Sequence, residues 1–103
     1  MFDNAQLCFI ADHPVEGSDN RFTLNGGSSR KIFGGPNMYR IKAGEQTVKV
    51  ISGNGDEWTV IATVKYQELL TIKLVLSGND ICDVLYKVEK SHPLTARIGV
   101  KLY

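Results

Sequence analysis

The residue types that usually carry catalysis are scarce in this chain. Its two histidines, His13 and His92, each stand directly before a proline. A proline restricts the preceding residue to extended backbone, which is typical of loops, so neither imidazole is expected to lie beside a nucleophile or a carboxylate. Asp and Glu residues are dispersed, and no pair is predicted to act as the acid and base of a glycosidase. We therefore predict that the protein is not an enzyme.

Metal and cofactor sites are not indicated either. A structural zinc site needs four Cys or His ligands with short local spacings, and the available set of Cys8, His13, Cys82 and His92 has no such spacing. Two loops rich in Asn, Gly and Asp contain oxygen ligands that calcium accepts, but they lack the ordered carboxylates of a calcium-binding loop. Turn formation alone explains these residue types. No metal and no cofactor is predicted.

Aromatic side chains are the remaining candidates for contact with a ligand. Trp58, Tyr39, Tyr66 and Tyr86 would form a stacking surface for sugars if they were exposed together. Trp58, however, begins a regular apolar stripe, which favours a place in the core. Carbohydrate binding therefore remains an alternative function, and it requires Trp58 and at least two tyrosines on one exposed surface.

Bulk composition excludes several classes of protein. A net charge of +1 over 103 residues provides no field that would draw the chain to nucleic acid. The longest apolar runs are much shorter than the roughly 20 residues that span a bilayer. The start of the chain lacks the features of a signal peptide, so a cytoplasmic protein is expected unless the chain is part of an exported one. Cys8 and Cys82 lie within apolar runs and are predicted to be buried, unpaired thiols.

The elements that would position these residues are strands. Apolar and polar residues alternate through most of the chain, which is the period of a strand with one buried face. Turn residues separate about eight such segments, and the connection at Gln67-Glu68 has no hairpin signature, which suggests a passage between two sheets. We predict a single domain over residues 1–103, an antiparallel immunoglobulin-like β-sandwich. The expected strands are residues 5–11, 21–24, 30–33, 39–51 with a break at Gly44, 58–66, 70–76, 83–89 and 96–103.

A shared period-two register predicts the core. Its expected members are Ile41, Val48, Val50, Trp58, Val60, Ala62, Val64, Ile72 and Leu74.

Three stretches resemble the PEGA-type bacterial β-sandwich modules and their uncharacterised relatives. They are residues 13–26, with His-Pro-Val-Glu-Gly followed by Phe-Thr-Leu-Asn-Gly, residues 41–50 around Gly44, and residues 71–76. The resemblance covers roughly residues 7–76. The chain lacks the Thr-Pro pair that is common between the two middle strands of the family, and residues 77–103 extend beyond the motif. The resemblance implies a small immunoglobulin-like accessory or interaction module without catalytic residues.

The predicted function is therefore a non-enzymatic interaction module whose partner is a protein, either a second copy or another chain. A sandwich leaves edge strands with unpaired backbone groups, and one edge is expected to be protected by Arg30-Lys31 and the Gly-Gly-Pro sequence at 34–36. The C-terminal strand contains no proline. If it lies at an edge, Arg97, Gly99 and Lys101 would contact the strand of a partner.

Overall fold

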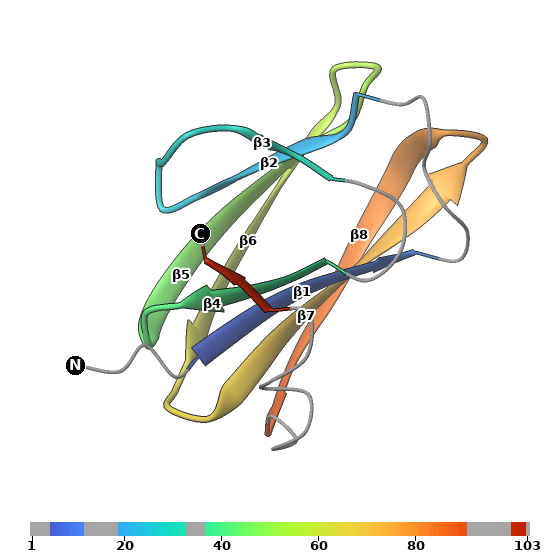
Figure 1. Ribbon diagram of the computed structural model, residues 1–103. Coiled ribbons are helices and arrows are strands. Elements are labelled where there is room, and N and C mark those ends of the chain that lie inside the picture. The colour runs from blue at the N-terminus through green and yellow to red at the C-terminus, as the bar shows by residue number, and fades with distance from the viewer. Residues whose placement is uncertain (1–4, 12–18, 33–36, 91–99, 103) are drawn as a thin grey trace.

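Two β-sheets pack face to face in the computed structural model, which describes residues 5–11, 19–32, 37–90 and 100–102 (Figure 1). No helix occurs among these residues, so none is long and apolar enough to cross a membrane. The strands are β1 (Ala5–Ala11), β2 (Arg21–Leu24), β3 (Arg30–Lys31), β4 (Asn37–Ile41), β5 (Gly44–Ile51), β6 (Glu57–Val64), β7 (Glu68–Ser77), β8 (Asp80–Lys90) and β9 (Val100–Leu102).

The strand order is β8-β7-β1-β4-β9 in the five-stranded sheet, here called sheet A, and β3-β2-β5-β6 in the four-stranded sheet B. All pairs in sheet B are antiparallel. Sheet A is mixed, because β1 runs parallel to β7 and β4 runs parallel to β9. The prediction of a wholly antiparallel sandwich is therefore wrong for sheet A. The reason is that β7 enters beside β1 from the other sheet, so no hairpin forces the two strands to run in opposite directions.

Two of the connections between the sheets lie wholly within the described residues. One lies between β4 and β5, where Gly44 adopts a φ of +130°, a conformation that favours glycine. The other lies between β6 and β7, where Gln67 has a φ of 62° and the N–H of Lys65 donates to Glu68 Oε1 at 2.8 Å. This confirms the predicted passage between sheets at Gln67-Glu68. The loops at 52–56 and 78–79 close the hairpins β5–β6 and β7–β8.

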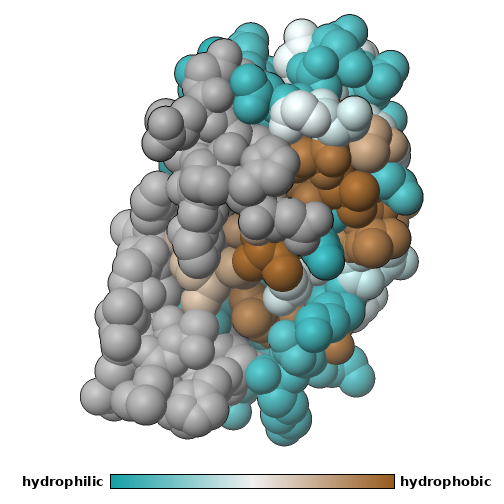
Figure 2. Space-filling model, turned by 90° about the vertical axis from the view of Figure 1, so that its right-hand side faces the viewer, coloured by the Kyte–Doolittle hydropathy of each residue, from teal (hydrophilic) through white to brown (hydrophobic). Residues whose placement is uncertain are grey.

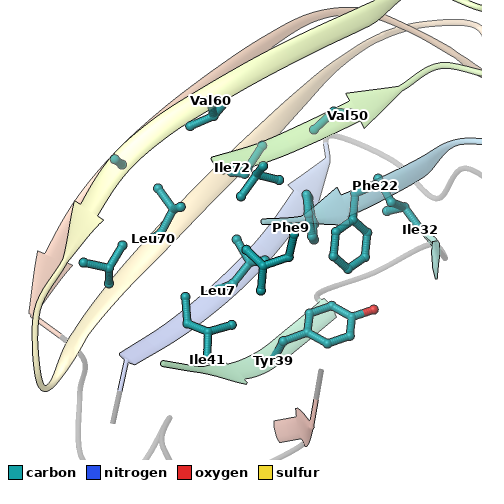
Figure 3. Packing of buried hydrophobic residues seen from close by; sticks show 14 of the residues in the cluster. Leu7, Phe9, Phe22, Ile32, Tyr39, Ile41, Val50, Val60, Leu70 and Ile72 are labelled. Carbon is teal, nitrogen blue, oxygen red and sulfur yellow. The ribbon is translucent and has the colours of Figure 1, made fainter. Parts of the chain in front are cut away.

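The core lies between the sheets, and three aromatic rings contact one another within it (Figure 3). Phe22 of β2 lies with its ring centroid 4.5 Å from that of Phe9 in β1 and 5.2 Å from that of Tyr39 in β4. Every side chain of the predicted core belongs to this cluster, although Trp58 packs against it only partly buried. Alternation within each strand thus identified the inward face correctly.

The two cysteines differ in burial. Both are free, as predicted. Cys8 is buried, and burial raises the pKa of its thiol above the ordinary value. Cys82 is exposed, so the prediction that it is buried is wrong. The reason is a β-bulge: Val75 pairs with Asp83 and Leu76 pairs with Ile81, which leaves Cys82 as the extra residue without a partner on β7.

Candidate functional site

The aromatic residues predicted to bind a ligand do not share one exposed surface. Tyr39 is buried within the core, and Trp58 is half-buried on the inner face of β6. Tyr66 and Tyr86 are exposed, at 60% and 53%. Tyr86 pairs with Ile72, whereas Tyr66 precedes Glu68 in the turn, so the two are offset by about 13 Å along the strand direction.

The predicted edge residues lie mostly outside the described part of the chain. β9 pairs with β4 and ends sheet A, with Lys101 opposite Tyr39. Arg97 and Gly99 lie outside the described residues, as does the Gly-Gly-Pro sequence at 34–36. Arg30-Lys31 forms β3, which ends sheet B as expected.

The two long edge strands lie on the same side of the sandwich. Sheet A ends there in β8, with 11 residues, and sheet B ends there in β6, with 8 residues, and the two strands contact each other. The opposite edges, as far as they are described, are the short strands β3 and β9. Short edges offer few unpaired backbone groups to a partner, so β6 and β8 carry most of the free edge in the described structure.

β8 extends beyond the cover that sheet B provides. Tyr86 and Val88 pair with Ile72 and Leu70 on β7 and therefore point to the inner side of sheet A. Their partners on β7 are fully buried, yet Tyr86 is 53% and Val88 36% exposed. The inner face of β8 is therefore apolar but uncovered along its second half.

The outer face of sheet A has a shallow depression of about 360 Å³ beside the same edge. The register places Ile10, Lys73 and Leu85 side by side across β1, β7 and β8. Leu85 is 53% and Ile10 36% exposed. Figure 2 views the molecule from the side on which the β7–β8 hairpin ends and shows apolar surface interrupted by hydrophilic side chains. β8 thus exposes apolar side chains on both of its faces.

Charged groups of both signs flank these apolar side chains. Lys87 Nζ lies 3.7 Å from Glu89 Oε2 in an exposed ion pair. Asp83 Oδ1 accepts a hydrogen bond of 2.8 Å from the backbone N–H of Val84. Because both contacts are exposed, each stabilises the fold only weakly. Within the described ranges, no group of three His, Cys, Asp or Glu side chains is placed to hold a metal ion.

Sequence reasoning missed the exposed pair Leu85 and Val88 as candidates for binding. The signal was present, since Val84, Leu85 and Tyr86 are consecutive and place apolar side chains on both faces of one strand. Such a strand is normally buried on both faces, and an edge position leaves it partly uncovered.

It also missed a group of buried polar residues at the ends of the sandwich. Asn20, Gln46 and Ser52 are all at most 2% exposed and hydrogen-bond to backbone groups of neighbouring loops. The backbone partners of Asn20 and Ser52 are distant in sequence, so no local pattern identifies them, whereas Gln46 donates to the nearby carbonyls of Gly44 and Lys42. Their bonds fix the loops, and the structure assigns them a role in stability.

Compared with protein-family models, curated proteins and solved structures, the chain matches none.

Proposed function

We propose that this chain is a non-enzymatic accessory module that binds another protein through the β8 edge of an immunoglobulin-like sandwich. The PEGA-type relationship and the bacterial origin that it implies belong to the same proposal, and they rest on the sequence motifs given above. The two packed sheets and the passage between them at Gly44 are compatible with such a module.

The observation that carries the proposal is the exposure of β8. An edge strand of 11 residues presents Leu85 on one face and Tyr86 and Val88 on the other. Soluble proteins usually blunt long edges with charges, proline or bulges. β8 has a bulge at Cys82 and exposed charges at Asp83, Lys87 and Glu89, but it contains no proline and exposes apolar side chains between these charges. A protein strand can supply both the hydrogen bonds for the free edge and the apolar cover for these side chains.

The chemistry of the edge favours protein over other partners. Asp83, Lys87 and Glu89 alternate in sign, which suits a polypeptide with mixed charge and offers no continuous positive surface to nucleic acid. The carbohydrate alternative now depends on Tyr66 and Tyr86, which lie apart. A cytoplasmic location is part of the proposal, because the exposed free thiol of Cys82 is stable in a reducing compartment.

Site-specific photo-cross-linking tests this function. A photoreactive amino acid replaces Leu85 in the intact protein, in the cells that make it, and the matched control carries the same amino acid in place of Lys31 on β3. We expect a discrete cross-linked protein product from position 85 and none from position 31, because β3 lies at the far edge of sheet B. The additional substitution Tyr86→Lys should remove the product, since it places a charge on the apolar inner face of β8.

Two results would contradict the proposal. Absence of any protein product from position 85 would show that the edge has no protein partner. Equal products from positions 85 and 31 would show that capture does not depend on β8.

A further inference from the structure

We infer that the protein partner is a second copy of this chain, and that the two copies pair their β8 strands antiparallel about a two-fold axis at Leu85. The inference rests on the proposed function, because it uses the same edge. It adds the identity of the partner and the register of the contact.

The direction of the backbone groups of β8 allows this pairing. The N–H of Val84 donates to the carboxylate of Asp83 at 2.8 Å, so it points away from β7 toward the free edge. Backbone groups alternate along a strand, so those of Tyr86 point the same way. A second β8 can then exchange hydrogen bonds between Val84 of one copy and Tyr86 of the other.

The sequence of β8 is complementary to itself in this register. With the axis at Leu85, Asp83 lies opposite the partner's Lys87, and symmetry repeats this pair on the other side. Leu85 meets the partner's Leu85 on the outer face, and Val84 meets the partner's Tyr86 on the inner face. Opposite charges and apolar pairs directly across a ladder are the contacts that stabilise a sheet.

Neighbouring registers lack this complementarity. Axes at residues 83, 86 or 87 place like charges directly opposite each other, and an axis at Val84 places Asp83 opposite Leu85. An axis at Val88 does pair Lys87 with Glu89, but it leaves Val84 and Leu85 beyond the paired residues of β8. The register at Leu85 is the one that uses the regular part of the strand and places Leu85 opposite Leu85 and Tyr86 opposite Val84.

Pairing also reduces the exposure of Tyr86 on the inner face, because it adds a neighbouring strand beside β8. Tyr86 and Val88 lie on the side of sheet A that faces sheet B, where they are 53% and 36% exposed. In the dimer, the inner faces of two β8 strands lie side by side, and each Tyr86 packs against Val84 of the other copy. Pairing breaks one hydrogen bond within the chain, from the N–H of Val84 to the carboxylate of Asp83. This carboxylate then faces Lys87 of the partner.

Charge exchange between two purified variants of the full chain tests the register. Asp83→Lys places two lysines at the contact of each copy, and Lys87→Asp places two aspartates there. In sedimentation experiments we expect each variant alone to have a dissociation constant raised by about tenfold or more, because two symmetric pairs become repulsive at once. An equimolar mixture should form a heterodimer, and the double variant D83K/K87D should dimerise within about threefold of the natural chain.

Glu57→Lys on β6 is the matched control, since Glu57 is exposed and lies outside β8, and its substitution should leave dimerisation within about threefold. Glu89→Lys is a diagnostic variant, because Glu89 Oε2 lies 3.7 Å from Lys87 Nζ. All substituted residues are exposed, and the fluorescence of Trp58 verifies that each variant is folded. If Glu89→Lys weakens dimerisation and Asp83→Lys has no effect on it, the two-fold axis lies at Val88 and the inference is overturned. Failure of the mixture to associate would overturn it as well.

The dimer and the proposed function fail in different ways. A chain that stays monomeric at all concentrations, while position 85 cross-links to a different protein, overturns the dimer and leaves the interaction module standing. A monomeric chain with no cross-linked protein product overturns both.

Discussion

Asn20 joins three parts of the chain at one end of the sandwich, and its removal gives the sharpest test of the fold. Its side chain is fully buried. The amide Nδ2 donates to the carbonyl of Asn79 in the β7–β8 turn at 3.1 Å, and Oδ1 accepts from the N–H of Gly53 in the β5–β6 loop at 2.9 Å. Its own carbonyl accepts from the N–H of Ile32 at 2.8 Å, so the backbone is held independently of the side chain.

Substitution Asn20→Ala removes two hydrogen bonds and leaves two backbone groups without their partners. Each buried group that loses its partner costs about 1–3 kcal/mol. Both bonds are only partly buried, so water can replace some of the interaction, and we expect the free energy of unfolding to fall by about 2–4 kcal/mol. Domains of this size are stable by about 5–15 kcal/mol, so the variant should remain folded in the absence of denaturant.

The substitution Asn20→Asp keeps the size of the side chain and changes its hydrogen bonding, so it separates these two contributions to stability. The introduced carboxyl group can still accept from Gly53, but when ionised it places a negative oxygen against the carbonyl of Asn79. Burial and this carbonyl raise its pKa in the folded state above the value of about 3.9 found in unfolded chains. The folded state then binds more protons than the unfolded state, so the stability of the variant relative to the natural chain is greatest below about pH 4 and falls as the pH rises.

Urea unfolding followed by the fluorescence of the single tryptophan, Trp58, measures these effects. The matched control is Asn54→Ala in the neighbouring exposed loop, where Oδ1 accepts a 3.0 Å bond from the N–H of Asp56. This control should cost less than about 1 kcal/mol, because water replaces an exposed partner. A loss below about 1 kcal/mol for Asn20→Ala, or a loss equal to that of the control, would refute the reasoning.

Three further outcomes follow from the core, the backbone and the thiols. Phe22→Ala should lower the free energy of unfolding by about 3–5 kcal/mol, whereas Trp58→Ala should lower it by only about 2 kcal/mol, because Trp58 is partly buried. Urea titration read by circular dichroism would contradict this if the order of the two losses were reversed. Gly44→Ala should lower the free energy of unfolding by about 1–3 kcal/mol, because a φ of +130° strains a residue that has a side chain. A Cβ at this position would meet no atom within 4 Å, so a clash adds nothing to this cost. An unchanged Tm in a thermal scan would contradict the strain. A thiol reagent should modify Cys82 rapidly in the native protein and Cys8 only on unfolding, because burial raises the pKa of Cys8 and shields it; two fast thiols, or none, would contradict the assignment.

Local features of the sequence were predicted well because their causes are local. The strands at 5–11 and 21–24 have the predicted bounds, since alternation begins and ends there with turn residues. The hairpin loop at 52–56 was identified by its Gly and Asn content, and the passage between sheets at 67 by the absence of such residues.

Pairing between distant strands could not be predicted in the same way. Alternation shows which face of β1 and of β7 is apolar, but it gives neither their neighbours nor their direction. The parallel pairing of Gln6 with Leu69 depends on where β7 enters sheet A after leaving β6. That position is a property of the whole chain, so no window of sequence contains it.

Buried polar residues escaped prediction for a related reason. Gln46 shares the inward face of β5 with Val48 and Val50, but its polar side chain gave no reason to count it in the core, and it is 2% exposed. Its Oε1 accepts from Asn25 at 2.9 Å, and Asn25 Oδ1 in turn accepts from the N–H of Thr47 at 2.7 Å. These contacts satisfy buried polar groups at the end of the β4–β5 connection, and they exist only once β2 and β5 have paired.

β8 shows where the pattern of a strand stops being informative about burial. Alternation places Val84, Tyr86 and Val88 on one face, and that face does point to the inner side of sheet A. Whether the face is covered depends on the opposing sheet, which has four strands against five. At the edge where β6 and β8 meet, Tyr86 and Val88 remain 53% and 36% exposed. An apolar inner face can be covered by a wider second sheet or by another chain. Asp83 and Lys87, opposite in sign, lie at equal distances from Leu85, and on this ground we propose a second copy of the same strand as the cover.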